Sequence, residues 1–146
     1  MRIKFIKAPD TWQIRHRVLR PNQLLEDCDY PNDRNPDSFH LGAFDGEDLI
    51  AIGSFYAERN ENIVAWKQYR LRGLATIPEF QRKGIGKHIL KFGLEHLQNN
   101  KADVLWCNAR STAGLFYKKL GFGEFEESFE VEGIGPHQLM YYLFHG

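Results

Sequence analysis

One stretch of the chain, residues 69–97, constrains the fold more than any other. It begins with an apolar, β-prone run at 69–77, and Pro78 ends this run because proline fixes φ and lacks the N–H that a sheet ladder needs. Apolar residues then recur at helical spacing over 85–97. The stretch therefore predicts a strand, a short glycine-containing basic turn and a helix, in that order.

The turn between this strand and this helix is suited to an anion. The first turn of a helix leaves about four backbone N–H groups unpaired, and the helix dipole is positive at that end. Two glycines let an anion approach the backbone closely, and three basic side chains add positive charge. The turn therefore predicts a phosphate or pyrophosphate site. Its residues are Gln81, Arg82, Lys83, Gly84, Ile85, Gly86 and Lys87.

Two common phosphate-binding motifs do not match this turn. A Walker-type loop needs four residues between its glycines and then Gly-Lys-Ser/Thr, whereas one residue separates these glycines and His88 follows Lys87. The dinucleotide fingerprint needs a third glycine three residues after the second, where this chain has Ile89. A nucleotide phosphotransferase is therefore disfavoured.

The turn instead resembles the coenzyme A pyrophosphate loop of the GNAT superfamily of N-acetyltransferases, Gln/Arg-x-x-Gly-x-Gly/Ala. A second motif strengthens this resemblance. In GNAT proteins a later helix carries Ala-x-x-x-Tyr and ends in Gly-Phe, and here the matching residues are Ala113, Tyr117, Gly121 and Phe122. The order of predicted strands and helices is similar as well, so the resemblance to small stand-alone bacterial-type members covers nearly the whole chain.

The remaining patterns complete the expected fold, a single GNAT-like domain spanning residues 1–146. We expect an α/β (α+β) architecture in which helices flank a mixed, mostly antiparallel central sheet. The strand after the central helix would run parallel to the strand before it, as in a right-handed βαβ unit, and the resemblance implies that these fourth and fifth strands splay apart. Strands are predicted at 2–7, 39–44, 49–56, 69–77, 104–108, 122–129 and 139–144, and helices at 11–19, 84–97 and 111–120.

The resemblance also implies acetyl-coenzyme A as co-substrate. Backbone groups of the fourth strand would hold the pantetheine arm, and the later helix would line its other side. At one position the chain departs from the family, because asparagine often stands three residues before the helix alanine and this chain has Arg110 there, with Asn108 two residues earlier. Either side chain can contact the cofactor. The predicted cofactor-binding residues outside the turn are Leu74, Ala75, Thr76, Asn108, Arg110 and Phe116.

Two residues are candidates for proton transfer. Tyr117 is the candidate general acid that protonates the departing thiolate, although it can instead simply pack against the cofactor. His137 follows a constrained Gly-Ile-Gly-Pro turn, and an imidazole changes charge near neutral pH, so this residue is a candidate base or substrate anchor or else a structural histidine. His40 and Glu58 are weaker candidates. Cys107 ends a predicted strand with no histidine beside it, so direct attack by the amine is preferred to a cysteine-bound intermediate.

Composition bounds the remaining function classes. Nineteen basic and nineteen acidic residues cancel, which disfavours a nucleic-acid partner. The two cysteines form no metal-ligand spacing, no His-x-x-x-His pattern occurs, and no metal site is predicted. The N-terminus lacks the apolar core of a signal peptide and no run approaches the ~20 apolar residues of a membrane helix, so a cytoplasmic location is expected. A homodimer is left open. The tryptophans at 12, 66 and 106 are predicted to lie in the core.

The sequence therefore predicts an N-acetyltransferase that moves an acetyl group from acetyl-coenzyme A to a primary amine of a small molecule or peptide. The alternative is a non-catalytic module that binds acyl-coenzyme A as a sensor. Five acidic residues in the polar segment 26–37 suggest a cationic acceptor, drawn in by their charge.

Overall fold

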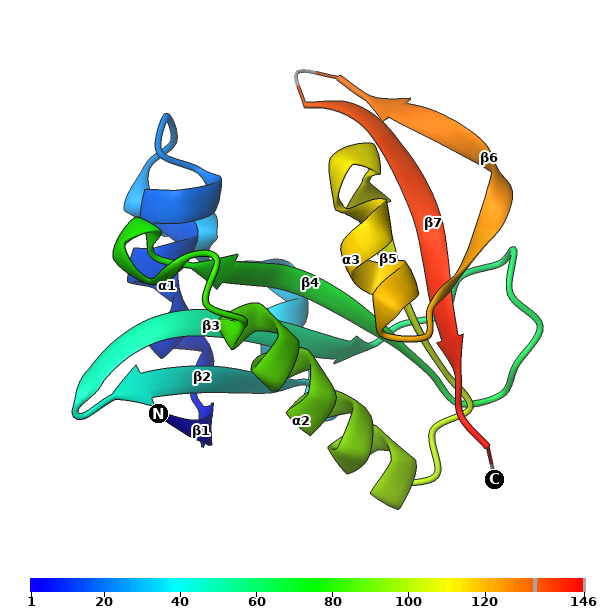
Figure 1. The fold of residues 1–146 in the computed structure, drawn as a ribbon, viewed down its shortest axis with the longest axis horizontal. Helices are drawn as coiled ribbons and strands as arrows, with labels where there is room; N and C mark the ends of the chain where they lie inside the picture. Colours follow the sequence, from blue (N-terminus) through cyan, green and yellow to red (C-terminus); the bar gives the residue numbers. More distant parts are fainter. Residues whose placement is uncertain (133, 146) are drawn as a thin grey trace.

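The computed structural model describes residues 1–132 and 134–145. Within them, one seven-stranded sheet has the order β1-β2-β3-β4-β5-β7-β6 (Figure 1). Neighbouring strands are antiparallel except β4 and β5, which run parallel. This confirms the predicted mixed, mostly antiparallel sheet. The strands are β1 (Arg2–Ile6), β2 (Phe39–Asp45), β3 (Asp48–Ala57), β4 (Gln68–Thr76), β5 (Val104–Arg110), β6 (Gly123–Val131) and β7 (Gly135–Leu143).

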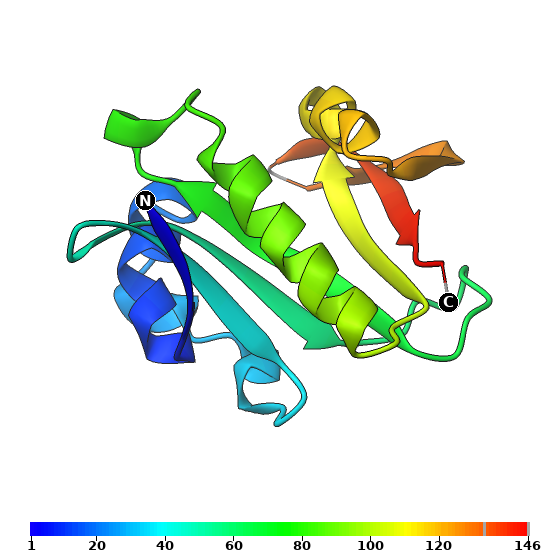
Figure 2. The ribbon, with the colours of Figure 1, turned by 60° about the horizontal axis from the view of Figure 1, so that its bottom comes forward.

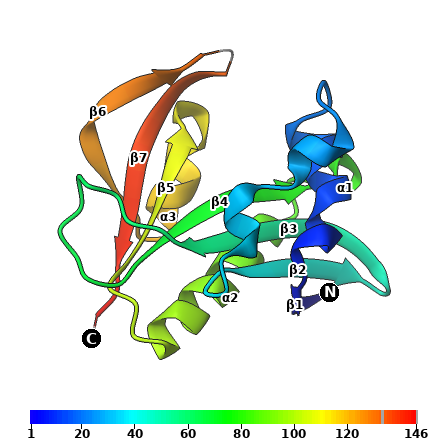
Figure 3. The ribbon, with the colours of Figure 1, turned by 180° about the vertical axis from the view of Figure 1, so that it is seen from behind.

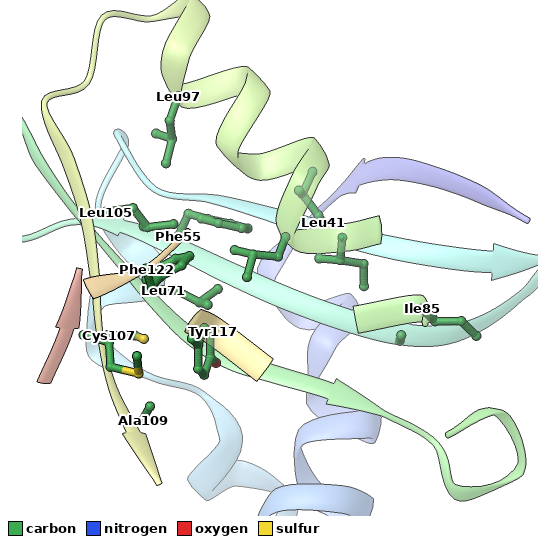
Figure 4. Close-up of a cluster of buried hydrophobic side chains, with 14 of the residues drawn as sticks. Leu41, Phe55, Leu71, Ile85, Leu97, Leu105, Cys107, Ala109, Tyr117 and Phe122 are labelled. Atoms are coloured by element: carbon green, nitrogen blue, oxygen red, sulfur yellow. The ribbon is translucent and has the colours of Figure 1, made fainter. Parts of the chain in front are cut away.

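The central helix α2 (Ile85–Asn99) runs diagonally across one face of the sheet (Figure 2). Its apolar stripe, spaced as the sequence predicted, buries Ile89, Leu90 and Leu97 completely or nearly so. The helix approaches β3 closely at Gly93, where an added Cβ would overlap the ring of Phe55. Residues from both halves of the sheet share the core beneath this helix (Figure 4).

Shorter helical segments cover the opposite face, as Figure 3 shows. The predicted helix at 11–19 is divided among three short helical segments. From the middle one, the Ile14 side chain packs against Ile52 and Ala75 of the sheet. No helix in the described part of the chain is long and apolar enough to cross a membrane. The segments on this face are η1 (Ala8–Thr11), α1 (Trp12–Ile14), η2 (Arg15–Leu19), η3 (Leu25–Cys28) and η4 (Pro31–Arg34). The segment η5 (Pro78–Phe80) lies between β4 and α2 in the chain, whereas η6 (Ser111–Ala113) and α3 (Gly114–Lys119) follow β5, and α3 lies on the same face as α2.

The sheet opens in its middle, between β4 and β5. Their parallel pairing covers three residue pairs, from Gln68 with Val104 to Arg70 with Trp106, and then stops. A bulge in β4 explains the divergence, because Ile52 and Ser54 of β3 face Ala75 and Arg72, which leaves one extra residue in β4. Gly73 takes the left-handed φ of 67° that this bulge requires. The two strands therefore separate into a V (Figure 1), which confirms the implied splay.

One core prediction was wrong. Trp106 is buried at 3% exposure, as expected, but Trp66 is 90% exposed. Trp66 lies outside β3 and β4, in the connection between them. A residue in such a connection has no neighbouring strand to cover it, so the apolar residues around Trp66 in the sequence did not indicate that its side chain is buried.

Candidate active site

The predicted anion-binding turn has an unusual backbone. Arg82 and Gly84 adopt left-handed φ angles of 64° and 78°, and Gly84 is the residue that caps α2. The helical ladder begins with the bond from the His88 N–H to the Gly84 carbonyl, at 3.2 Å. The backbone N–H groups of 85–87 therefore precede the ladder and lack helical partners.

The side chains of this turn divide into two groups. The basic groups of Arg82, Lys83 and Lys87 are exposed, as a contact with an anion in solution needs. Ile85 is 6% exposed and packs into the core, so only its backbone can meet a ligand. Gln81 donates from Nε2 to the Thr76 carbonyl at 2.9 Å and thereby ties the turn to the end of β4.

A cavity of about 320 Å³ fills the splay between β4 and β5. Because the strands no longer pair with each other there, their facing backbone edges are open to a ligand. Leu74 lines this cavity and also lies 3.9 Å from the position that a Cβ on Gly86 would take, so the cavity adjoins the anion-binding turn. The other lining residues include Asn108 and Arg110.

The structure places the remaining predicted cofactor residues differently. Ala75 and Thr76 continue β4 beyond the cavity lining, and Ala75 is buried against Ile52. Phe116 packs its ring edge-on against Tyr117, with ring centroids 5.0 Å apart, and is not among the described residues that line the cavity.

Tyr117 lies on α3, lines this cavity and is 9% exposed. Burial raises the pKa of its phenol, and the adjacent Cys107 raises it further, so the hydroxyl stays protonated at neutral pH. The two side chains lie next to each other in Figure 4. Burial also raises the pKa of Cys107 to about 12, which keeps the thiol protonated and unreactive.

His137 follows the turn as expected but already lies within β7, which begins at Gly135 rather than at the predicted residue 139. Strand pairing extends to it from both sides, with Arg110 of β5 and Phe129 of β6, because the hairpin between β6 and β7 is longer than its apolar pattern indicated. Gly133 of the predicted turn lies outside the described residues. The Nδ1 atom of His137 donates to the Gly135 carbonyl at 2.9 Å, since a carbonyl can only accept. In the neutral ring, Nε2 is then left as a hydrogen-bond acceptor.

A second, larger cavity of about 630 Å³ adjoins the splay and shares His137, Asn108 and Arg110 with it. Its other walls come from the segment after η2, from Tyr30 and from the hairpin of β6 and β7. Sequence reasoning missed its arginines. Arg70 and Arg72 stand two residues apart in a strand, a spacing that puts both side chains on one face, and this spacing was the available signal.

Tyr30 organises one wall of the larger cavity. The guanidinium carbons of Arg15, Arg72 and Arg20 lie 4.1, 4.4 and 5.2 Å from the centre of its ring. The Tyr30 hydroxyl also accepts a hydrogen bond from Nε of Arg20 at 3.0 Å. Tyr30 is 5% exposed, so this aromatic ring fixes the positions of the arginines around it.

Beneath Tyr30 lies a buried ion pair. Arg15, fully buried, donates to Asp33 from both terminal nitrogens at 2.6 and 3.1 Å and also to the hydroxyls of Ser54 and Tyr56. Tyr56 in turn donates to Asp33 at 2.6 Å. Burial would raise the pKa of Asp33, but these hydrogen bonds outweigh it and the pKa is lowered.

These contacts reduce the free negative charge on which the expected attraction of a cationic acceptor was based. In segment 26–37, Asp33 neutralises Arg15, Asp29 pairs with Arg34 at 2.7 Å, and Asp27 accepts from the Leu24 N–H. Three of the carboxylates therefore serve the local fold.

The two weaker base candidates are held by other side chains of the fold. Burial lowers the pKa of His40, whose Nδ1 lies 2.7 Å from the Ser54 hydroxyl. Glu58 accepts from Arg70 at 2.9 Å and from Asn32 at 2.6 Å. Neither is among the described residues that line either cavity.

Comparisons with known proteins agree with this geometry. The profile of the acetyltransferase (GNAT) domain family matches residues 16–143. The chain is also similar to the Uncharacterized N-acetyltransferase YitI of Bacillus subtilis (strain 168), with 39% identity over 141 residues that cover 97% of this chain and 95% of that protein.

Solved structures resemble the fold at lower identity. The ribosomal-protein-S18-alanine N-acetyltransferase of Escherichia coli matches with a TM-score of 0.79 and 17% identity, over 99% of this chain and 94% of that one. An aminoglycoside 6'-N-acetyltransferase complexed with coenzyme A matches with a TM-score of 0.79 and 11% identity, over 100% and 98%. A family profile over most of the chain and a relative of such similarity establish that the chain belongs to the GNAT family of N-acetyltransferases, which use acyl-coenzyme A donors.

Proposed function

We propose that the protein transfers an acetyl group from acetyl-coenzyme A to a primary amine by direct attack. One observation carries this proposal: the splay cavity adjoins the anion-binding turn through Leu74 and shares His137 with the larger cavity. A donor and an acceptor entering from these two directions would meet between Tyr117 and His137.

The residues present fit the coenzyme. The free N–H groups at the start of α2 and the exposed basic side chains of Arg82, Lys83 and Lys87 suit its pyrophosphate. The open backbone edges of β4 and β5 suit the extended, amide-containing pantetheine arm. When bound, acetyl-coenzyme A supplies an acetyl group activated as a thioester.

His137 is proposed as the base for the acceptor. A primary amine is mostly protonated at neutral pH and must lose a proton before it can attack. The bond from Nδ1 to the Gly135 carbonyl orients the ring and leaves Nε2 to accept that proton. Its place in the lining of both cavities puts it where donor and acceptor would meet.

Tyr117 is proposed as the general acid. Its raised pKa keeps the hydroxyl protonated at neutral pH. Tyr117 also lines the splay cavity, where the thiolate of the proposed donor would leave. A hydrogen bond from a protonated phenol stabilises charge developing on sulfur. Cys107, protonated and buried beside it, has no part as a nucleophile in this proposal.

Thiol release tests the proposal. The protein is incubated with acetyl-coenzyme A and a panel of primary amines, free thiol is followed with a thiol-reactive dye, and acetylated product is identified by mass. We expect amine-dependent thiol release with matching product. Tight coenzyme binding, measured by calorimetry, together with thiol release at background for every amine would instead favour the non-catalytic sensor.

A further inference from the structure

The larger cavity is strongly cationic. Four arginines line it, and no carboxylate does among the residues that the structure describes. The four are Arg20, Arg70, Arg72 and Arg110. Of these, only Arg70 has a described carboxylate partner, Glu58 at 2.9 Å. The walls of this cavity therefore carry a positive charge that side chains in the described part of the protein leave mostly unbalanced.

Arg72 shows the imbalance most clearly. It is half-buried, it stacks on the Tyr30 ring at 4.4 Å, and no described acidic side chain lies within ion-pair distance of it. Burial lowers the pKa of its guanidinium and the neighbouring Arg70 lowers it further, yet a guanidinium stays charged in proteins. A charge withdrawn from water in this way is costly unless an opposite charge meets it.

Arg70 adds a second positive charge to the same wall of the cavity. Its Nε atom is buried and has no hydrogen-bond partner among the described residues, although its Nη1 atom is occupied by Glu58. The guanidinium carbon lies 5.0 Å from the Trp106 ring, which holds the group in place beside the cavity. An oxyanion in the cavity would therefore meet this guanidinium beside the unpaired guanidinium of Arg72.

We infer that the acceptor is a small primary amine that carries an oxyanion, a carboxylate or a phosphate, which Arg72 and its neighbouring arginines bind while the amine reaches His137. The inference rests on the proposed function. A cavity of about 630 Å³ is of the size that encloses a small molecule. His137, Arg70 and Arg72 line both cavities, whereas Tyr30 and Arg20 line the larger one alone. The amine therefore belongs beside His137, and the oxyanion nearer to Tyr30, on which Arg72 stacks.

Pairs of acceptors that differ in one charge test the inference. The protein is assayed for thiol release with amino acids against their methyl esters, with O-phosphoethanolamine against ethanolamine, and with spermidine as a cationic amine. We expect kcat/KM to be at least about tenfold higher for an anionic member than for its neutral partner, since a charge-assisted bond to guanidinium is lost in the latter. The carboxylate and phosphate pairs show which oxyanion is preferred.

Three variants test whether the preference for anionic acceptors depends on the arginines of the cavity. Arg72→Gln should lower the anionic-to-neutral ratio of kcat/KM at least about tenfold, whereas Arg72→Lys should retain much of it because the charge remains. Arg2→Gln removes the same charge from an exposed residue of β1, outside the cavity, and should leave the ratio as it is. Thermal unfolding of each variant shows that the fold is kept.

The outcomes separate the inference from the proposed function. Equal or better turnover of neutral esters or spermidine overturns the inference while the transferase activity stands. If no amine is turned over although coenzyme A binds, the proposed function fails, and calorimetry with O-phosphoethanolamine and the amino acids then decides the inference. Binding that Arg72→Gln abolishes supports an oxyanion site, and absence of binding overturns it.

Discussion

Asp33 gives the most direct test of how the fold supports the site. Asp33→Ala removes the partner of a fully buried guanidinium, because the side chains of Arg15 and Asp33 are 0% and 2% exposed. Removing one partner of a buried ion pair costs about 3–5 kcal/mol, against about 5–15 kcal/mol for the stability of a whole domain. For a chain of this size the melting temperature should fall by roughly 6–20 °C.

The chain contains a matched control. Asp29 pairs with Arg34 at 2.7 Å, nearly the same distance as the 2.6 Å between Arg15 and Asp33, but its partner is 69% exposed. An exposed pair contributes only about 0–1 kcal/mol. Asp29→Ala should therefore lower the melting temperature by a few degrees at most, on the order of 2–4 °C. Calorimetry and urea unfolding measure both variants, and equal losses would refute the argument from burial.

The pH dependence of the free energy of unfolding tests the same ion pair. Because the folded pKa of Asp33 is lowered, its carboxylate stabilises the fold above the unfolded value of about 3.9, and the contribution is lost as pH falls through the folded value. Asp33→Asn keeps the shape of the side chain but removes the group that titrates. The difference in free energy of unfolding between wild type and Asp33→Asn should be constant above about pH 5 and shrink towards acid. A difference that grows as the pH falls would contradict the assignment.

The remaining predictions concern the turnover site. Tyr117→Phe should lower kcat by about 10²-fold or more with coenzyme affinity little changed, and an unaffected rate removes it as the acid. His137→Gln should lower kcat/KM by about 10²-fold, and full activity would show that another group takes the proton. Gly84→Ala should weaken coenzyme binding measured by calorimetry, since its φ of 78° costs a side chain about 1 kcal/mol or more. Gly86→Ala should leave the melting temperature almost unchanged, because its Cβ would lie 3.9 Å from Leu74, and an equal loss of melting temperature in both glycine variants would count against the backbone argument.

The parts of the fold that local pattern controls could be predicted from the sequence. The turn at 81–86 depends on neighbouring residues, so glycines, basic side chains and the onset of helical spacing were sufficient to predict it. The hairpin between β2 and β3 likewise turns after Asp45, with Gly46 at a φ of 62°. The parallel pairing of β4 with β5 followed from the helix between them.

What pattern could not reveal are contacts between distant segments. Nothing near Arg15 in the chain shows that a helical arginine is fully buried, because its partner Asp33 lies eighteen positions away and its other contacts come from Cys28, Tyr30 and β3. For the same reason the acidic segment looked like a source of free negative charge. The insertion of β7 between β5 and β6 is also a matter of long-range pairing, and the same pairing makes β7 begin earlier than its apolar pattern indicated, so that the strand includes His137.

The short pairing of β4 with β5 has a consequence for cooperativity. In the described chain, three residue pairs are all that joins β1–β4 to β5–β7 through sheet hydrogen bonds. Such a junction allows sub-global opening, in which one half of the sheet exchanges its amide hydrogens while the other remains protected. A ligand that spans both edges stabilises the closed state by mass action. When coenzyme A is present, the amide hydrogens of the two halves should therefore exchange at similar rates, because the ligand joins β4 to β5 where the strands do not pair.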